Sequence, residues 1–189
     1  AAPLPKQSTR GGPRAAVGKK NPQAKITVPG NRGIKVVRAI TILRPASVLY
    51  RFWRDVRNLP RIIHHPAVIT PTSDTESHWE VSAPAGKTVA WDALLINDQP
   101  DRLIAWRSRE GGDVDHAGSV RFEAAPGDAG TEVTVALEYD PPGGKLGAAV
   151  AKLWGDSASS QVYDALRRFK VLMEGGEIPS TDAQPVSGP

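Results

Sequence analysis

The sequence contains no cysteine, which excludes disulfide bonds, thiolate metal ligands and a cysteine nucleophile. No apolar run approaches the roughly 18–20 residues that a membrane-spanning helix requires, and no apolar signal-peptide segment follows the first lysines. The four histidines form neither a His-x-His nor a His-Glu-x-x-His arrangement, so the pattern favours no metal site. We therefore expect a cytoplasmic protein that uses neither a metal ion nor a cofactor.

Acidic residues are missing from residues 1–33, which carry a formal charge of +7. Residues 34–189 hold 17 basic and 20 acidic residues, so the net basicity of the chain belongs to its N-terminal segment. Because that segment is rich in Pro and Gly and poor in large apolar residues, we expect a disordered tail there. A second flexible tail is expected over 179–189. The basic tail suggests weak contact with an anionic membrane or nucleic acid, and a simply solvated tail is the alternative.

Between the tails, residues 34–178 show the periodicity of one folded domain. Residues 35–43 are rich in β-branched side chains and predict a strand. A helix over 46–56 follows, in which apolar residues recur at spacings of three and four. Pro45 suits the first turn of that helix. A second short helix is predicted around residues 62–63.

Six further strands are predicted, because apolar and polar residues alternate and turn residues recur roughly every 8–12 positions. They cover 65–71, 77–83, 88–97, 102–109, 118–125 and 131–139. A helical apolar pattern then runs from Leu146 to Met173. It is interrupted near residue 155, where Asp156 or Ser157 is a suitable helix cap. This predicts either one long kinked helix or two helices in succession.

The order of these elements predicts an α+β fold, in which a curved antiparallel sheet of about six to seven strands surrounds a long C-terminal helix. A strongly curved sheet and a single helix leave a concave space between them. Sites in such spaces are mostly apolar and carry a few polar groups. We therefore expect residues 34–178 to form one ligand-binding domain.

Several short motifs resemble a known family in their order and spacing. They are Phe52-Trp53-Arg54-Asp55, Asn58-Leu59-Pro60, Ser77-His78-Trp79, Ala83-Pro84-Ala85-Gly86, Trp91-Asp92-Ala93, Trp106-Arg107-Ser108, Gly118-Ser119-Val120-Arg121-Phe122, Gly130-Thr131-Glu132-Val133, Tyr139-Asp140-Pro141-Pro142-Gly143-Gly144 and Leu166-Arg167-Arg168-Phe169-Lys170. The chain resembles the polyketide cyclase/dehydrase and lipid-transport branch of the START-like (SRPBCC, helix-grip) superfamily. The resemblance implies a helix-grip fold with a hydrophobic cavity. The superfamily includes ring cyclases, lipid and sterol carriers and quinone-binding proteins, so the resemblance does not choose between binding and catalysis.

Aromatic side chains are the main candidates for the wall of this cavity. Five tryptophans are present, and three of them fall on predicted strands, where they would stack against a flat ligand. Packing within an ordinary core is the alternative role. The candidate ligand-binding residues are Trp53, His64, Trp79, Trp91, Trp106, Arg107, Tyr139 and Tyr163.

Strand alternation predicts which way the polar candidates face. If Trp79 faces the cavity, His78 faces outward. Arg121, which lies between two apolar residues, is expected on the outer face beside a strand carboxylate. A position in the cavity, where it would bind a carboxylate or carbonyl group of the ligand, is the alternative. Of the adjacent His64 and His65, at most one faces the cavity if the chain is extended there, and a surface position for both is the alternative.

Three functions fit these observations. The first is a non-enzymatic carrier or sensor of a lipid, quinone or polyketide-like molecule, because no convincing catalytic cluster emerges. The second is a cyclase or dehydratase, which needs a general base or an enolate stabiliser in the pocket. The candidates for that role are His64, Arg107, Glu138, Tyr139 and Tyr163. The third is an interaction module tethered by its basic tail. The segment 155–159 lacks the second glycine of a Gly-x-Ser-x-Gly nucleophile elbow, so we interpret it as a helix cap.

Overall fold

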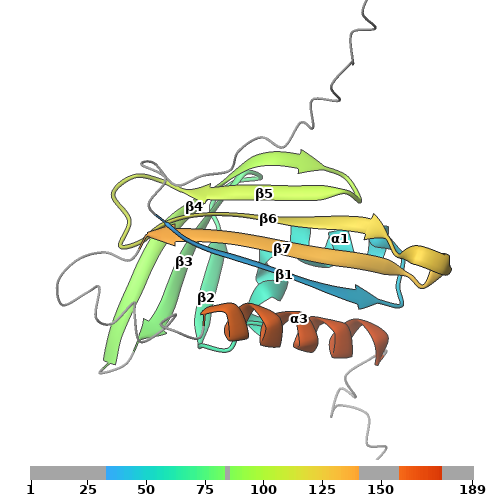
Figure 1. Ribbon diagram of the computed structural model, residues 1–189. Coiled ribbons are helices and arrows are strands. Elements are labelled where there is room, and N and C mark those ends of the chain that lie inside the picture. Colours follow the sequence, from blue (N-terminus) through green and yellow to red (C-terminus); the bar gives the residue numbers. More distant parts are fainter. Residues whose placement is uncertain (1–32, 84–85, 141–157, 176–189) are drawn as a thin grey trace, which may run out of the picture.

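The computed structural model describes residues 33–83, 86–140 and 158–175. In these residues, antiparallel strands form one sheet in the order β1-β7-β6-β5-β4-β3-β2. The strands are β1 (Ile34–Ile42), β2 (Ala67–Pro71), β3 (Glu76–Ala83), β4 (Lys87–Gln99), β5 (Leu103–Ser108), β6 (Asp115–Ala124) and β7 (Thr131–Asp140). The helical elements are α1 (Ala46–Arg54), η1 (Val56–Arg61), η3 (Pro126–Asp128) and α3 (Ala158–Glu174). The predicted α+β fold, with a curved antiparallel sheet and a C-terminal helix, is confirmed (Figure 1).

Some predictions concern residues outside the described part of the chain. The predicted tail over 1–33, apart from Gly33, and the predicted tail over 179–189 lie there. So do the helical segment before Ala158, its predicted caps Asp156 and Ser157, and the fifth tryptophan, Trp154. These remain predictions.

Apolar residues gather on one face of the sheet because they alternate with polar ones along the strands. In β4, Val89, Trp91 and Ala93 are buried, whereas Thr88 and Asp92 are exposed. The antiparallel register then aligns the inward residues of neighbouring strands, so that this apolar face continues from strand to strand across the sheet.

An irregularity in β4 places one carboxylate beside the first helix. The register between β4 and β5 shifts between Leu95 and Asn97, so that Leu95 pairs with Trp106 and Asp98 with Ile104. A bulge of this kind inserts one residue and reverses the facing of the residues after it. Asp98 consequently lies on the side of the sheet that carries α1.

The first helix ends earlier than the apolar spacing predicts. Helix α1 stops at Arg54, and Asp55 adopts an extended conformation with φ −88° and ψ 95°. The Asp55 carboxylate accepts a hydrogen bond from the Arg57 backbone N–H and begins the separate 3-10 helix η1. Because Asp favours capping positions over helix interiors, a local side-chain contact overrides the periodicity here.

The C-terminal helix is fastened to the sheet edge by polar contacts to backbone groups. Lys170 Nζ donates to the carbonyl of Thr41 at 2.6 Å. Arg44 Nε donates to the carbonyl of Met173 at 2.7 Å, and Glu174 Oε1 accepts from the backbone N–H of Leu43 at 2.7 Å. Helix α3 therefore lies beside β1, as Figure 1 shows.

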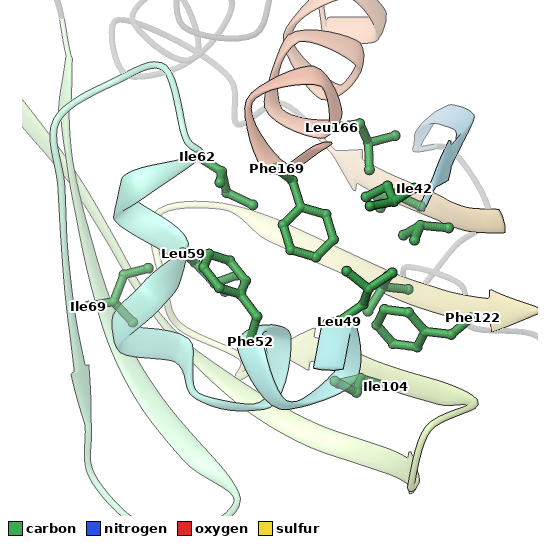
Figure 2. Packing of buried hydrophobic residues seen from close by; sticks show 13 residues of the cluster. Ile42, Leu49, Phe52, Leu59, Ile62, Ile69, Ile104, Phe122, Leu166 and Phe169 are labelled. Atoms are coloured by element: carbon green, nitrogen blue, oxygen red, sulfur yellow. The ribbon is translucent and has the colours of Figure 1, made fainter. Parts of the chain in front are cut away.

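The main core lies where α1, η1 and α3 meet the sheet. Phe169 of α3 is fully buried and its ring centroid lies 5.0 Å from that of Phe52 in α1. Figure 2 shows Phe169 pointing from α3 towards α1 and η1, among the other buried side chains. The thirteen residues of this cluster include Ile42, Leu49, Phe52, Leu59, Ile62, Phe122, Leu166 and Phe169. None of the helices among the described residues is both long enough and apolar enough to span a membrane.

Candidate functional site

A cavity of about 760 Å³ lies between the concave face of the sheet and the helices α1, η1 and α3. Strands β2 to β7 all contribute lining residues, and so do the three helices. The volume falls within the range of roughly 300–1,000 Å³ that is usual for sites that bind small molecules. Alanines on the helix side, Ala158 and Ala165 of α3, help to leave this space open.

Stacked indole rings form one wall of the cavity. Trp79 of β3 and Trp91 of β4 are directly opposite in the register. Their ring centroids lie 5.7 Å apart, with planes 19° from parallel. Trp79 Nε1 donates to Ser77 Oγ at 2.9 Å, which holds its ring in place. The pair offers a flat, rigid apolar surface of the kind that stacks against planar ligands.

A third indole depends on a glycine in the next strand. Trp106 of β5 pairs with Gly118 of β6. A Cβ atom at position 118 would lie 2.4 Å from Trp106 Cζ2. Only the absence of a side chain at Gly118 therefore lets the Trp106 ring rest on the sheet while it lines the cavity.

At the β6–β7 end of the cavity lies a buried imidazole. His116 is 8% exposed, and its ring meets the Trp91 ring edge to face at a centroid distance of 5.1 Å. Its backbone N–H donates to Ser108 Oγ at 3.0 Å. Neither ring nitrogen has a hydrogen-bonding partner within the described residues. A buried polar group without a partner costs about 1–3 kcal/mol.

Burial also fixes the charge of this ring. It lowers the pKa of His116 to about 4, because the cation would lose its hydration. At neutral pH the ring is therefore uncharged, with one nitrogen as donor and the other as acceptor. Tyr139 lies directly opposite on β7, and burial raises the pKa of its phenol.

Charged residues that line the cavity sit at its rim, and one of them, Arg54, is held in an ion pair by Asp98 of β4. Arg54 Nε donates to Asp98 Oδ2 at 2.7 Å, and Arg54 Nη2 donates to the carbonyl of Asp74 at 3.0 Å. The Tyr50 hydroxyl donates to Asp98 Oδ1 at 2.6 Å. Burial, followed by the hydrogen bond to Asp98, raises the pKa of Tyr50 to about 12. This network ties α1 to β4 and to the turn between β2 and β3.

Six of the eight candidate ligand-binding residues line the cavity, and two do not. The lining residues are Trp53, His64, Trp79, Trp91, Trp106 and Tyr139. Arg107 lies between the inward Trp106 and Ser108 and pairs with Ala117, which places its side chain on the outer face. Tyr163 is 44% exposed on α3, whereas its neighbour Val162 lines the cavity. Glu138 precedes Tyr139 in β7 and therefore lies on the other face of the sheet. It is buried there, with Lys35 Nζ 3.8 Å from its carboxylate.

The adjacent histidines lie at the rim. The chain bends at His64 and His65 instead of running extended, so their rings meet edge to face at 5.2 Å. Both line the cavity, and the expectation that at most one would face it does not apply, because it depended on an extended chain. Arg168 Nη2 donates to His64 Nδ1 at 2.9 Å.

The outward positions predicted for two other side chains agree with the structure. His78 lies on the outer face beside Asp92, with 2.7 Å between Nδ1 and Oδ1. That hydrogen bond is the main reason why the pKa of His78 is raised. Arg121 Nε lies 3.9 Å from a carboxylate oxygen of Glu123 on the same strand.

Sequence reasoning missed His116 because it began the strand at Gly118, three residues late. The strand begins at Asp115. Extending the alternation of Val120 and Phe122 back by two and four residues places Gly118 and His116 on the same inward face. That extension is the signal that could have found it. Within the described residues, no three His, Asp or Glu side chains gather in a way that could hold a metal ion.

Comparisons with known proteins agree with this architecture. The family model described as polyketide cyclase/dehydrase and lipid transport matches residues 42–167. The crystal structure of a protein from Deinococcus radiodurans shares 40% sequence identity, with a TM-score of 0.63, and the match covers 76% of this chain and 99% of that one. The sequence matches none of the curated proteins with which it was compared.

Two more distant structures share the fold. A protein from Chromobacterium violaceum has 13% identity and a TM-score of 0.58, over 74% of this chain and 97% of that one. The di-domain ARO/CYC StfQ from the steffimycin biosynthetic pathway has 14% identity and a TM-score of 0.54. That match covers 76% of this chain and 51% of StfQ.

Proposed function

The chain belongs to the polyketide cyclase/dehydrase and lipid-transport family, and from that premise we propose that it binds a small hydrophobic or aromatic molecule as a carrier or sensor. The ligand, of the lipid, quinone or polyketide type, occupies the cavity between the sheet and α3. The observation that carries this proposal is the cavity of about 760 Å³ and its tryptophan wall.

The chemistry of the cavity supports binding better than turnover. A general base works best when its pKa lies near the working pH. Burial lowers the pKa of His116 to about 4 and raises the pKa of Tyr139. At neutral pH the imidazole is therefore a weak base and the phenol a weak acid. The charged groups Arg54 and Asp98 at the rim are already bound to each other.

A cyclase or dehydratase is the second candidate. The observation that favours it is the pairing of His116 with Tyr139, two proton-bearing groups that line the same cavity. Turnover of a poly-ketone substrate by the purified protein, lost in H116F, would establish this function in place of the carrier. The tethering role of residues 1–33 remains a separate proposal, which deletion of that segment tests through salt-sensitive binding to anionic vesicles or nucleic acid.

The first experiment is native mass spectrometry of the protein purified from its own host, followed by organic extraction. We expect one defined lipid, quinone or aromatic compound at close to one per chain. A protein that carries no extractable compound, and that also fails to bind the naphthalene probes described below, would contradict the proposal.

A cavity-filling variant locates the binding site. Ala165 lines the cavity on α3, so A165F should weaken binding of the extracted compound by about tenfold or more, because the new ring occupies its space. R167F, at an exposed position on the same helix, is the matched control and should leave the affinity unchanged. Equal affinities of the two variants would place the ligand elsewhere.

A further inference from the structure

The cavity is lined by an imidazole that can both donate and accept a hydrogen bond and that the described residues leave unpaired. His116 is buried and lines the cavity, and both of its ring nitrogens are without a hydrogen-bonding partner among the described residues. The indole N–H of Trp53 also lacks a partner among the described residues, but it can only donate, whereas the indole N–H of Trp79 is engaged by Ser77. Buried polar groups are nearly always paired in folded proteins, so an unpaired pair of nitrogens facing a cavity points to a partner that enters it.

Neighbouring rings determine how that partner reaches His116. Trp91 contacts the imidazole edge to face and stacks with Trp79, so the three rings form a continuous row in the cavity wall. A planar ligand that lies against the indoles would therefore bring a substituent on its edge towards His116. Gly118, on the same face of β6 as His116, is covered by the ring of Trp106, which lines the cavity as well.

We propose that His116 recognises a neutral hydroxyl or carbonyl group on the edge of a flat apolar ligand. A phenolic or enolic hydroxyl suits either tautomer of the ring, because it can accept from the imidazole N–H or donate to the unprotonated nitrogen, whichever of the two nitrogens faces the ligand. This inference rests on the proposed function, because it names the chemical class of the ligand in the same cavity.

The distribution of charge around the cavity disfavours an anionic head group at His116. Burial disfavours the imidazolium form, so the ring brings no positive charge. The cationic side chains that line the described part of the cavity, Arg51, Arg54 and Arg57, together with the rim histidines, come from the α1–η1 side. Arg54 and Arg57 are already paired with Asp98 and Asp55. A carboxylate placed at His116 would be desolvated without a counter-charge.

A pair of probes that differ in a single group tests this recognition. The probes are 2-naphthol and 2-methylnaphthalene, which present a hydroxyl and a methyl group of similar size on the same ring system. Binding is measured by isothermal titration calorimetry at pH 7 with wild type, H116F and, as a matched control, H78F. His78 is half exposed on the outer face of the same sheet, so its substitution leaves the cavity intact.

We expect wild type and H78F to bind 2-naphthol about five- to tenfold more tightly than 2-methylnaphthalene, as one net hydrogen bond predicts. In H116F this preference should vanish, while the affinity for 2-methylnaphthalene is kept. If both probes bind wild type with equal affinity, or if H116F keeps the preference, the role of His116 is overturned and the apolar cavity still stands. If neither probe binds wild type, the inference fails, and the proposed function fails with it when the purified protein also carries no extractable compound.

A second measurement does not depend on the folding of H116F. The ring nitrogens of His116 in ¹⁵N-labelled wild type are followed by NMR during both titrations. The chemical shift of the nitrogen that faces the ligand should move with 2-naphthol, because that nitrogen gains a hydrogen bond to the hydroxyl, and should respond much less to 2-methylnaphthalene. Identical responses to the two probes would overturn direct recognition. The variant H116N, which keeps one donor and one acceptor, should retain part of the preference for 2-naphthol.

Discussion

The two ends of the concave sheet face differ in how completely side chains fill the space between the sheet and the helices. At the closed end, Phe52 of α1 and Phe169 of α3 meet over β-strand residues such as Phe122, and their rings fill the space (Figure 2). At the cavity end the large rings come from the sheet and from α1, which contributes Trp53, whereas α3 on the other side presents Ala158 and Ala165. Large rings on both sides make a core, whereas large rings on one side and alanines on the other leave a cavity.

The comparison separates stability from binding. A substitution that opens space in a densely packed region lowers the free energy of unfolding roughly in proportion to the volume of that space. At the cavity end space is already open, so the sheet side chains are held by one another, as Trp79, Trp91 and His116 are. Substitutions at the closed end should therefore act mainly on the free energy of unfolding. Substitutions at the cavity end should act on the affinity for ligands and on how strongly that affinity depends on the polar groups of the ligand.

The largest expected effect is at the closed end. F169A should lower the free energy of unfolding by about 3–5 kcal/mol, because it removes a fully buried ring from between α1 and α3. Urea denaturation at pH 7 measures the change. The control is V171A, on the same helix at a residue that is 72% exposed, which should change stability by less than about 0.5 kcal/mol. Similar losses in both variants would contradict the difference between buried and exposed positions.

The next effect is a pH dependence at the cavity end. Burial holds the pKa of His116 near 4 in the folded protein, while the unfolded chain has the ordinary value of about 6.5. Protons therefore bind the unfolded state first, and wild type should lose up to about 3 kcal/mol of stability between pH 6.5 and pH 4. Above pH 6.5 this contribution is constant. Tyr139, opposite on β7, stays neutral throughout because burial raises its pKa.

Subtracting the stability profile of H116F from that of wild type isolates this contribution, because the other titrating groups cancel. Unfolding in urea is measured at several pH values from 7 to 4. Parallel profiles would show that His116 is not held neutral by burial. H78F tests a pH dependence of the opposite sign. The raised pKa of His78 stabilises the folded protein at low pH, and this stabilisation is lost as the pH rises through that pKa.

The smallest effect concerns the contact between Trp106 and Gly118. G118A should destabilise the protein by about 1–3 kcal/mol, because the added methyl group would lie 2.4 Å from the ring and must displace it. The displaced indole should also weaken probe binding in the cavity. Urea denaturation and calorimetry with 2-methylnaphthalene measure the two effects. S119A, on the outward side of the same strand, is the control, and equal behaviour of the two variants would contradict the role of Gly118.

Much of the fold could be predicted because it depends on local patterns. Runs of β-branched residues and alternation identified all seven strands, and alternation grouped Trp91 with Val89 and Ala93 on one face. The errors arose where a capping side chain or a bulge changes the local backbone structure. Asp55 ends α1 early by capping η1, and the bulge after Leu95 carries β4 beyond its predicted end to Gln99. Such features depend on individual hydrogen bonds and pairings, which periodicity does not report.

The candidate site was less predictable than the fold. Arg107 follows three consecutive buried residues, Leu103, Ile104 and Ala105. Apolar residues therefore do not alternate with polar ones in this strand, and the sequence pattern does not show which face Arg107 is on. Its outward position follows from its pairing with Ala117. His116 required the true start of β6, which the turn residues before it obscured.

The sequence by itself determined the order of the elements and the residues that share a strand face, because both depend on spacings of two to four residues. Tertiary structure alone decided that the rings of Phe52 and Phe169 close one end while Ala158 and Ala165 leave the other open. It also decided that His116 lies buried without a protein partner on either nitrogen in the described part of the chain. These outcomes depend on strand register and helix placement, which are set by contacts between residues far apart in the chain.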